Sequence, residues 1–141
     1  MTKTNIKISF GELRDLYVNL LAVANKKLPI RLSHVISKNM QMISEEVHLI
    51  DDCRIKMAEN YADKDENGEP KFNDDKYVIS DENAMKFNVE LNEYYSTTTE
   101  IDIYKISADE LNKLEEQRYD ALSPSEIGTL MFMLDEESDT N

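Results

Sequence analysis

Apolar positions along the chain recur mainly at helical spacing, and the longest run extends from about residue 31 to residue 62 without a glycine or proline. Its seam positions alternate in steps of four and three, the heptad spacing that keeps one stripe of a helix facing a partner helix. These seam positions are Ile36, Met40, Ile43, Val47, Ile50, Arg54, Met57 and Tyr61. At 1.5 Å per residue, the segment predicts a helical rod of about 45 Å.

A second heptad stripe follows a polar stretch of the chain. Ser80 is placed to cap its first turn, and its seam positions are Ala84, Phe87, Leu91, Tyr94 and Thr98. Two such stripes joined by a polar connection predict an antiparallel helical hairpin over residues 31–98, with its tip at residues 63–79.

The first stripe contains one charged residue, Arg54. A long side chain near a helix end can bury its aliphatic stem while its charge stays in water, and the pattern favours this interpretation. The alternative is a buried charge that sets the register of the hairpin by pairing with a carboxylate of the facing helix.

Shorter elements precede the hairpin and follow it. Residues 5–10 and 100–106 alternate apolar and polar side chains, which predicts two strands that pair through Ile6 and Ile8. Ser9 and Glu12 form a capping-box pattern that opens a helix between the first strand and the hairpin. The buried stripe of this helix is expected at Leu13, Leu16, Tyr17, Leu20, Leu21 and Ala24.

Two further capping patterns lie in the C-terminal third, at Ser107–Glu110 and Ser123–Glu126. The first predicts a short helix, and the second a last helix that buries Ile127, Leu130, Met131 and Leu134. The fold class is therefore mainly α: an antiparallel helical hairpin with a long central helix, packed with N- and C-terminal helices, plus a small two- or three-stranded β element. We expect a single helical domain over residues 1–134 and a mobile acidic tail at 135–141.

Charge is distributed unevenly along the chain, which has a formal net charge of −13. Residues 1–40 carry seven basic and two acidic groups, so the remainder is strongly acidic. Direct binding to nucleic acid or to an anionic membrane is not expected, because both require an excess of Lys and Arg. The asymmetry can arise from attraction between the two parts of the chain or from two separate partner surfaces. The favoured interpretation is surface charge that serves solubility.

The residues that usually carry chemistry form no recognisable catalytic pattern. His34 and His48 belong to no metal-binding motif, and Cys53 has only Arg54 nearby to lower its pKa, with acidic neighbours opposing that effect. His48, Asp51 and Asp52 share one side of a helix at a spacing that could hold a metal ion, but a solvated helix flank is the favoured interpretation. We expect no enzyme activity and no cofactor. The single cysteine and the absence of a long apolar run are typical of a reducing, non-membrane compartment.

One loop has the opening of a calcium site. Asp63, Asp65 and Asn67 precede Gly68 with the spacing of a calcium-binding loop. The twelfth position, however, is Asp74 rather than the usual Glu, and no helix pattern follows. The favoured alternative is a turn in which Asn67-Gly68 supplies a positive φ.

Several stretches together resemble a family of small proteins encoded by tailed bacteriophages and prophages of Gram-positive bacteria. They are residues 26–43 (KKLPIRLSHVISKNMQMI), 61–70 (YADKDENGEP), 77–95 (YVISDENAMKFNVELNEYY), 100–107 (EIDIYKIS) and 122–134 (LSPSEIGTLMFML). The resemblance covers nearly the whole chain by general pattern and includes no catalytic signature. It implies a phage accessory protein located in the host cytoplasm, and it assigns no active-site residue.

Three functions follow as hypotheses. The first is a non-catalytic protein that binds a host or phage protein through its helical hairpin and acidic surface, and so inhibits a host defence factor. The partner-binding candidates flank the seam, at Glu45, Glu46, His48, Asp52 and Glu59. The second is an acidic mimic of nucleic acid that inhibits a DNA- or RNA-binding enzyme. The third is a virion assembly or structural factor, whose heptad seams close between copies in a homo-oligomer.

Overall fold

The computed structural model describes residues 2–135, which form a mainly helical fold with a small sheet. The helices are α1 (Phe10–Ala24), α2 (Ile30–Tyr61), α3 (Asp81–Tyr95) and α4 (Pro124–Leu130), with 3₁₀ turns η1 (Ala108–Glu115) and η2 (Met131–Met133). The strands are β1 (Thr2–Ser9), β2 (Phe72–Asn73), β3 (Lys76–Tyr77), β4 (Thr98–Ser107) and β5 (Leu134–Asp135). The fold class expected from the sequence is confirmed.

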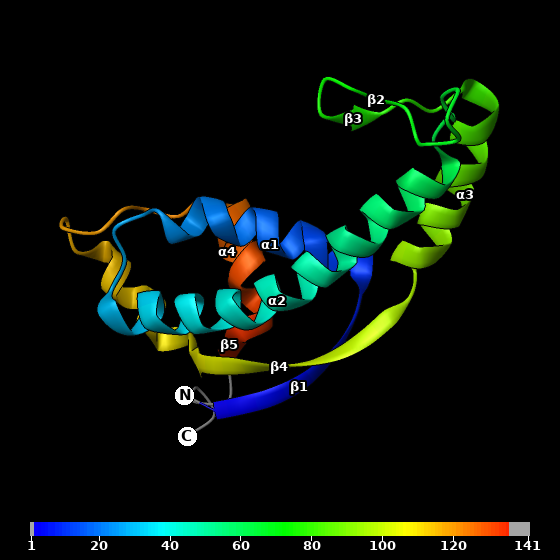
Figure 1. Cartoon of the computed structure of the whole chain (residues 1–141). Coiled ribbons are helices and arrows are strands. Elements are labelled where there is room, and N and C mark those ends of the chain that lie inside the picture. The colour runs from blue at the N-terminus through cyan, green and yellow to red at the C-terminus, as the bar shows by residue number, and fades with distance from the viewer. Residues whose placement is uncertain (1, 136–141) are drawn as a thin grey trace.

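The molecule consists of a body and a projecting arm that share one long helix (Figure 1). The first half of α2 packs in the body with α1, β4 and the C-terminal elements, and its second half extends beyond them. There α3 returns antiparallel to α2, and the short β2–β3 hairpin lies at the tip (Figure 1). The predicted helical hairpin and its polar tip are therefore present.

The α2 seam is buried in the body and partly open in the arm. Ile36, Ile43, Val47 and Ile50 are at most 5% exposed, because α1 and β4 cover this half of the helix. Farther along, the Tyr61 ring meets Phe87 of α3 edge-on at 6.0 Å between centroids. No residue of α3 is buried, so the arm is held by a single layer of contacts rather than by a core of its own.

The structure agrees fully with neither of the two interpretations of Arg54. Its side chain is 36% exposed, and its Nε atom lies 3.7 Å from an Asp51 carboxylate oxygen one turn earlier on the same helix. The less favoured alternative, pairing with a carboxylate of the facing helix, is thus wrong. Helix α1, which lies outside the hairpin, contributes a second cation, Arg14, whose Nε lies 2.9 Å from the same oxygen of Asp51.

Three details of the predicted first and last helices differ in the structure. In α1, Val23 is buried while Leu21 and Ala24 are exposed, because the stripe follows steps of three beyond Leu20. After α4 the helix tightens into η2, which buries Met133 and exposes Met131. The predicted Leu134 helix position is instead the start of strand β5.

Other helix and strand boundaries also differ from those predicted from the sequence. Thr98 belongs to β4 and not to the α3 seam, and the Ser107 cap opens a 3₁₀ turn rather than an α-helix. Asp135, which the sequence assigns to the tail, lies in β5. The rest of the predicted tail, residues 136–141, lies outside the described residues.

The three-stranded sheet has the order β1-β4-β5 and is anchored to α2 by one buried side chain. Strands β1 and β4 pair antiparallel with Ile6 opposite Ile101, which confirms the predicted pairing. On the other side of β4, the Asn39 side chain accepts the Tyr104 N–H at 2.7 Å and donates to the Tyr104 carbonyl at 2.9 Å. Asn39 is fully buried, and its side chain satisfies the backbone N–H and carbonyl of Tyr104 as a neighbouring strand would.

Replacing Asn39 with Leu is expected to lower the free energy of unfolding by about 2–4 kcal/mol, because both backbone groups of Tyr104 lose their partner inside the protein. Urea unfolding followed by circular dichroism measures the change. Gln41→Ala is the control, since Gln41 is exposed on the same helix, and it should alter stability by less than about 0.5 kcal/mol. Equal effects of the two substitutions would refute the anchoring role.

Glu126 joins the α4 cap to the segment after α1, and it predicts a pH-dependent stability. Its carboxylate pairs with Lys26 Nζ at 2.8 Å and accepts the Ser123 N–H at 2.9 Å, and these contacts lower the pKa of Glu126 below its ordinary 4.5. The ionised form therefore stabilises the fold above about pH 4.5, and the contribution disappears as the pH falls through the lowered pKa.

Glu126→Gln is accordingly expected to have a lower urea midpoint than the unmodified chain at pH 7. The difference should shrink as the pH falls from 7 toward 3, because the Glu126 carboxyl of the unmodified chain takes up a proton as the pH passes through its lowered pKa. Glu115→Gln, at an exposed position in η1, serves as the matched control. A gap between Glu126→Gln and the unmodified chain that stays constant from pH 7 to pH 3 would contradict the assignment.

Candidate functional site

The partner-binding residues predicted from the sequence lie along α2, and most of them share one exposed face. Glu45, His48, Asp52 and Glu59 are exposed and follow one another at helical spacing, whereas Glu46 is half-buried. This acidic stripe is a solvated helix surface, and its residues line neither of the two hollows described below.

A more distinctive surface lies on α3, where the sequence analysis assigned no site. Met85 and Val89 are 72% and 61% exposed, although both are apolar and one turn apart. Together with Tyr61, Lys86, Glu90 and Glu93, they line a shallow groove of about 590 Å³ on the arm, which we call the arm groove. The i, i+4 spacing of Met85 and Val89 outside the seam was the signal available in the sequence.

Hydrogen bonding and charge both act at the rim of the arm groove. The Tyr61 hydroxyl donates to a Glu90 carboxylate oxygen at 2.5 Å, and this bond raises the pKa of Tyr61 above its ordinary 10.0. Glu93 adds a second carboxylate on the same helix. The groove thus combines apolar side chains with a predominantly negative edge.

The base of the arm is a junction of three helices centred on Asp51. Arg14 of α1 pairs with Asp51 of α2, and its guanidinium carbon lies 5.0 Å from the centroid of the Tyr95 ring of α3. One arginine therefore contacts both helices of the arm, and this contact helps to set the angle at which the arm leaves the body.

Neighbouring aromatic rings complete this junction. Phe10 of α1 meets the Tyr94 ring at 5.1 Å between centroids. Burial raises the pKa of Tyr94 to about 12, and contact with Cys53 contributes to the same shift. Cys53 itself is exposed and lies beside a phenol rather than a base, so the described geometry supplies no group to activate it as a nucleophile.

The loop with the calcium-like pattern folds as a set of turns. Asp65 Oδ1 accepts the backbone N–H groups of Asn67 and Glu69, and Asp63 Oδ1 accepts that of Ser80. Gly68 has a φ of +78°, as a turn at Asn67-Gly68 requires. Within residues 2–135, no group of three or more His, Cys, Asp or Glu side chains could hold a metal ion.

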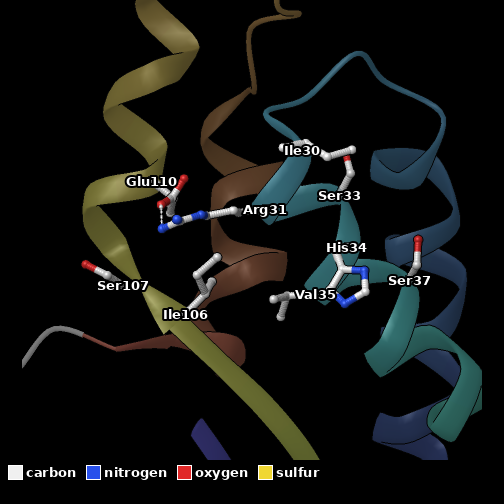
Figure 2. A pocket seen from close by; sticks show the side chains of 9 residues that line it. All are labelled: Ile30, Arg31, Ser33, His34, Val35, Ser37, Ile106, Ser107 and Glu110. Atoms are coloured by element: carbon white, nitrogen blue, oxygen red, sulfur yellow. Dashed lines mark ion pairs between the residues drawn. The ribbon is translucent and has the colours of Figure 1, made fainter. Parts of the chain in front are cut away.

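A larger cavity lies in the body between the first turns of α2 and the end of β4 (Figure 2). Its volume is about 730 Å³, and Val35 and Ile106, both almost fully buried, line it. Arg31 and Glu110 face each other across one side, and His34 lies on the other (Figure 2). Its remaining lining residues are Ile30, Ser33, Ser37 and Ser107. No pattern in the sequence predicted this body cavity.

The two parts of the chain with opposite charge contact each other directly. Four basic residues from the first forty pair with acidic residues from the remainder: Lys3 with Asp102, Arg14 with Asp51, Lys26 with Glu126, and Arg31 with Glu110. Attraction within the chain therefore accounts for part of the charge asymmetry seen in the sequence.

No helix in the described part of the chain is long and apolar enough to cross a membrane. Comparison with known proteins found no matching family model, no matching curated protein and no matching solved structure.

Replacing Asp51 with Asn is expected to lower the free energy of unfolding by about 1 kcal/mol, because the two arginines lose their shared countercharge at a partly exposed site. Asp52→Asn is the matched control, since Asp52 is exposed next to it and has no ion pair among the described residues. Urea unfolding of both variants at low and moderate salt provides the comparison. The same loss in both variants would contradict the role of Asp51 in the junction.

Proposed function

We propose that this chain is a non-catalytic protein that binds another protein through its helical hairpin, with the arm groove as the principal contact. The arm has little internal core to maintain, and it extends clear of the body, where a partner can reach it (Figure 1). The resemblance to a phage protein family makes a host or phage protein the expected partner, and a host defence factor a natural target.

The observation that carries this proposal is the exposure of Met85 and Val89 on α3. Both are in contact with water over most of their surface, and they lie beside Tyr61 in a hollow rather than on a convex helix surface. Apolar side chains gathered at such a hollow are typical of a protein interaction site.

The charge around the arm groove defines the chemistry of the partner. Between residues 51 and 95 the chain has thirteen acidic and six basic side chains, and Glu90 and Glu93 border the groove itself. A complementary partner is an amphipathic segment that presents apolar side chains flanked by Lys or Arg. The acidic stripe from Glu45 to Glu59 then contributes to long-range attraction.

Mimicry of nucleic acid is the second hypothesis, and the contacts favour it less. A mimic requires a continuous acidic face, but four basic residues of the N-terminal segment lie against acidic partners. The hypothesis of a homo-oligomeric virion component has also lost its main argument, because Ile36, Ile43 and Ile50 of the heptad seam are already buried within one chain.

The proposal is tested by capture from a lysate of a Gram-positive host, with the chain immobilised and the bound protein identified. Met85→Ser with Val89→Ser is expected to abolish capture, because the double substitution removes the apolar part of the arm groove. Val18→Ser with Leu21→Ser is the matched control, because these two apolar residues are exposed on α1. The control variant should capture the same partner as the unmodified chain, and a rising salt concentration should release that partner.

Loss of capture in the control variant as well, or its persistence in the α3 variant, would refute the arm groove as the contact. A third variant, Glu45→Lys with Asp52→Lys, separates the two acidic surfaces. It should slow association without abolishing the complex, since these residues lie on the stripe and not in the groove.

A further inference from the structure

The body cavity has the composition of a small-molecule site and lies away from the arm. Its volume of about 730 Å³ falls in the usual range for such sites. Val35 and Ile106, only 2% and 7% exposed, line its apolar part. Ile30 is 82% exposed at the same cavity, so an apolar side chain there is open to water unless a ligand covers it.

One charged group at this cavity, the Arg31 guanidinium, is available to a ligand. The Glu110 carboxylate is 12% exposed, and its closest cation is Lys113, at 2.8 Å. Arg31 lies 3.9 Å from the other oxygen of Glu110 and remains 76% exposed. Glu110 is shared by Lys113 and the more distant Arg31, so the exposed Arg31 guanidinium has N–H donors left for an anionic group.

The opposite side of the cavity has polar side chains that can form hydrogen bonds, and none of them is acidic. His34, Ser33 and Ser37 come from the first two turns of α2 (Figure 2). The first turn of α2 contains no acidic residue, and no side chain caps it. An anion at the mouth of the cavity therefore meets Arg31 and the start of α2, with Glu110 as the one carboxylate among the lining residues.

We propose that the body cavity binds a small amphipathic carboxylate, an aliphatic chain that ends in one carboxyl group. The aliphatic chain lies on Val35 and Ile106 and covers Ile30, while the carboxylate pairs with Arg31 at the mouth. Both halves of the ligand are needed, because the apolar lining supplies contact area and the guanidinium supplies orientation. This inference concerns a different surface from the arm groove and does not depend on it.

Octanoate is the probe, and amide NMR shifts of the full chain report where it binds. The expected result is saturable binding with a Kd of roughly 1 mM or below, with the largest shifts at residues 30–37 and 106–110. Acetate, which has the charge alone, and 1-octanol, which has the chain alone, should each bind at least tenfold more weakly.

Arg31→Met separates the charge from the shape of the site, because it retains an aliphatic side chain at an exposed position and so leaves the fold intact. It should weaken octanoate at least tenfold and leave 1-octanol unchanged. Arg118→Met is the matched control, since Arg118 is an exposed arginine that pairs with Glu116 outside the cavity. Equal octanoate affinity in the Arg31→Met variant, shifts centred on the arm groove, or no saturable shift would overturn the proposal.

Discussion

The hydrogen-bonded pair between the Asn39 side chain and the Tyr104 backbone connects the two halves of this fold. Without it, β4 would have two unpaired backbone groups buried against α2, since β5 begins its pairing only at Ile106. Asn39 Nδ2 also donates to the Met133 sulfur at an N···S distance of 3.8 Å, which brings η2 to the same point. Helix α2, the sheet and the C-terminal turns thus share one buried polar residue.

This anchor has consequences for both candidate surfaces. Because β4 is held against the first half of α2, its end lies beside the first turns of that helix, and the body cavity forms between them (Figure 2). The second half of α2 has no such cover and depends on α3 and the Asp51 junction. A well-packed body and a thinly packed arm are therefore consequences of where the sheet contacts the long helix, and the two parts are suited to different ligands.

Much of the fold could be predicted because its signals are local. The heptad stripe from Ile36 to Tyr61, the cap at Ser80 and the capping box at Ser123–Glu126 each report on neighbouring residues, and the structure confirms all three elements. Asn39 gave no such signal, because its partner is 65 residues away and an isolated Asn within a helix carries no pattern. The β2–β3 turn was likewise missed, because Asp74 and Asp75 adopt positive φ values where Gly or Asn is usual.

The candidate sites were less predictable than the fold. Exposure depends on what packs against a helix, so the spacing of Met85 and Val89 outside the seam indicated a second apolar face on α3 but not whether another element covers it. The charge count did suggest a negatively charged hairpin, but the predicted stripe on α2 lies outside the arm groove, which is lined mainly by residues of α3. The body cavity joins residues from distant segments, α2 and η1, and no local pattern relates them.

Hydrogen–deuterium exchange of the purified complex with its captured partner tests the central claim most directly, because it maps the contact on the intact chain. If the hairpin binds through the arm groove, slowed exchange on complex formation will concentrate in α3 between residues 85 and 93 and in the adjoining end of α2. Slowed exchange confined to the body, or to the α2 stripe from Glu45 to Asp52 with α3 unchanged, would contradict the account.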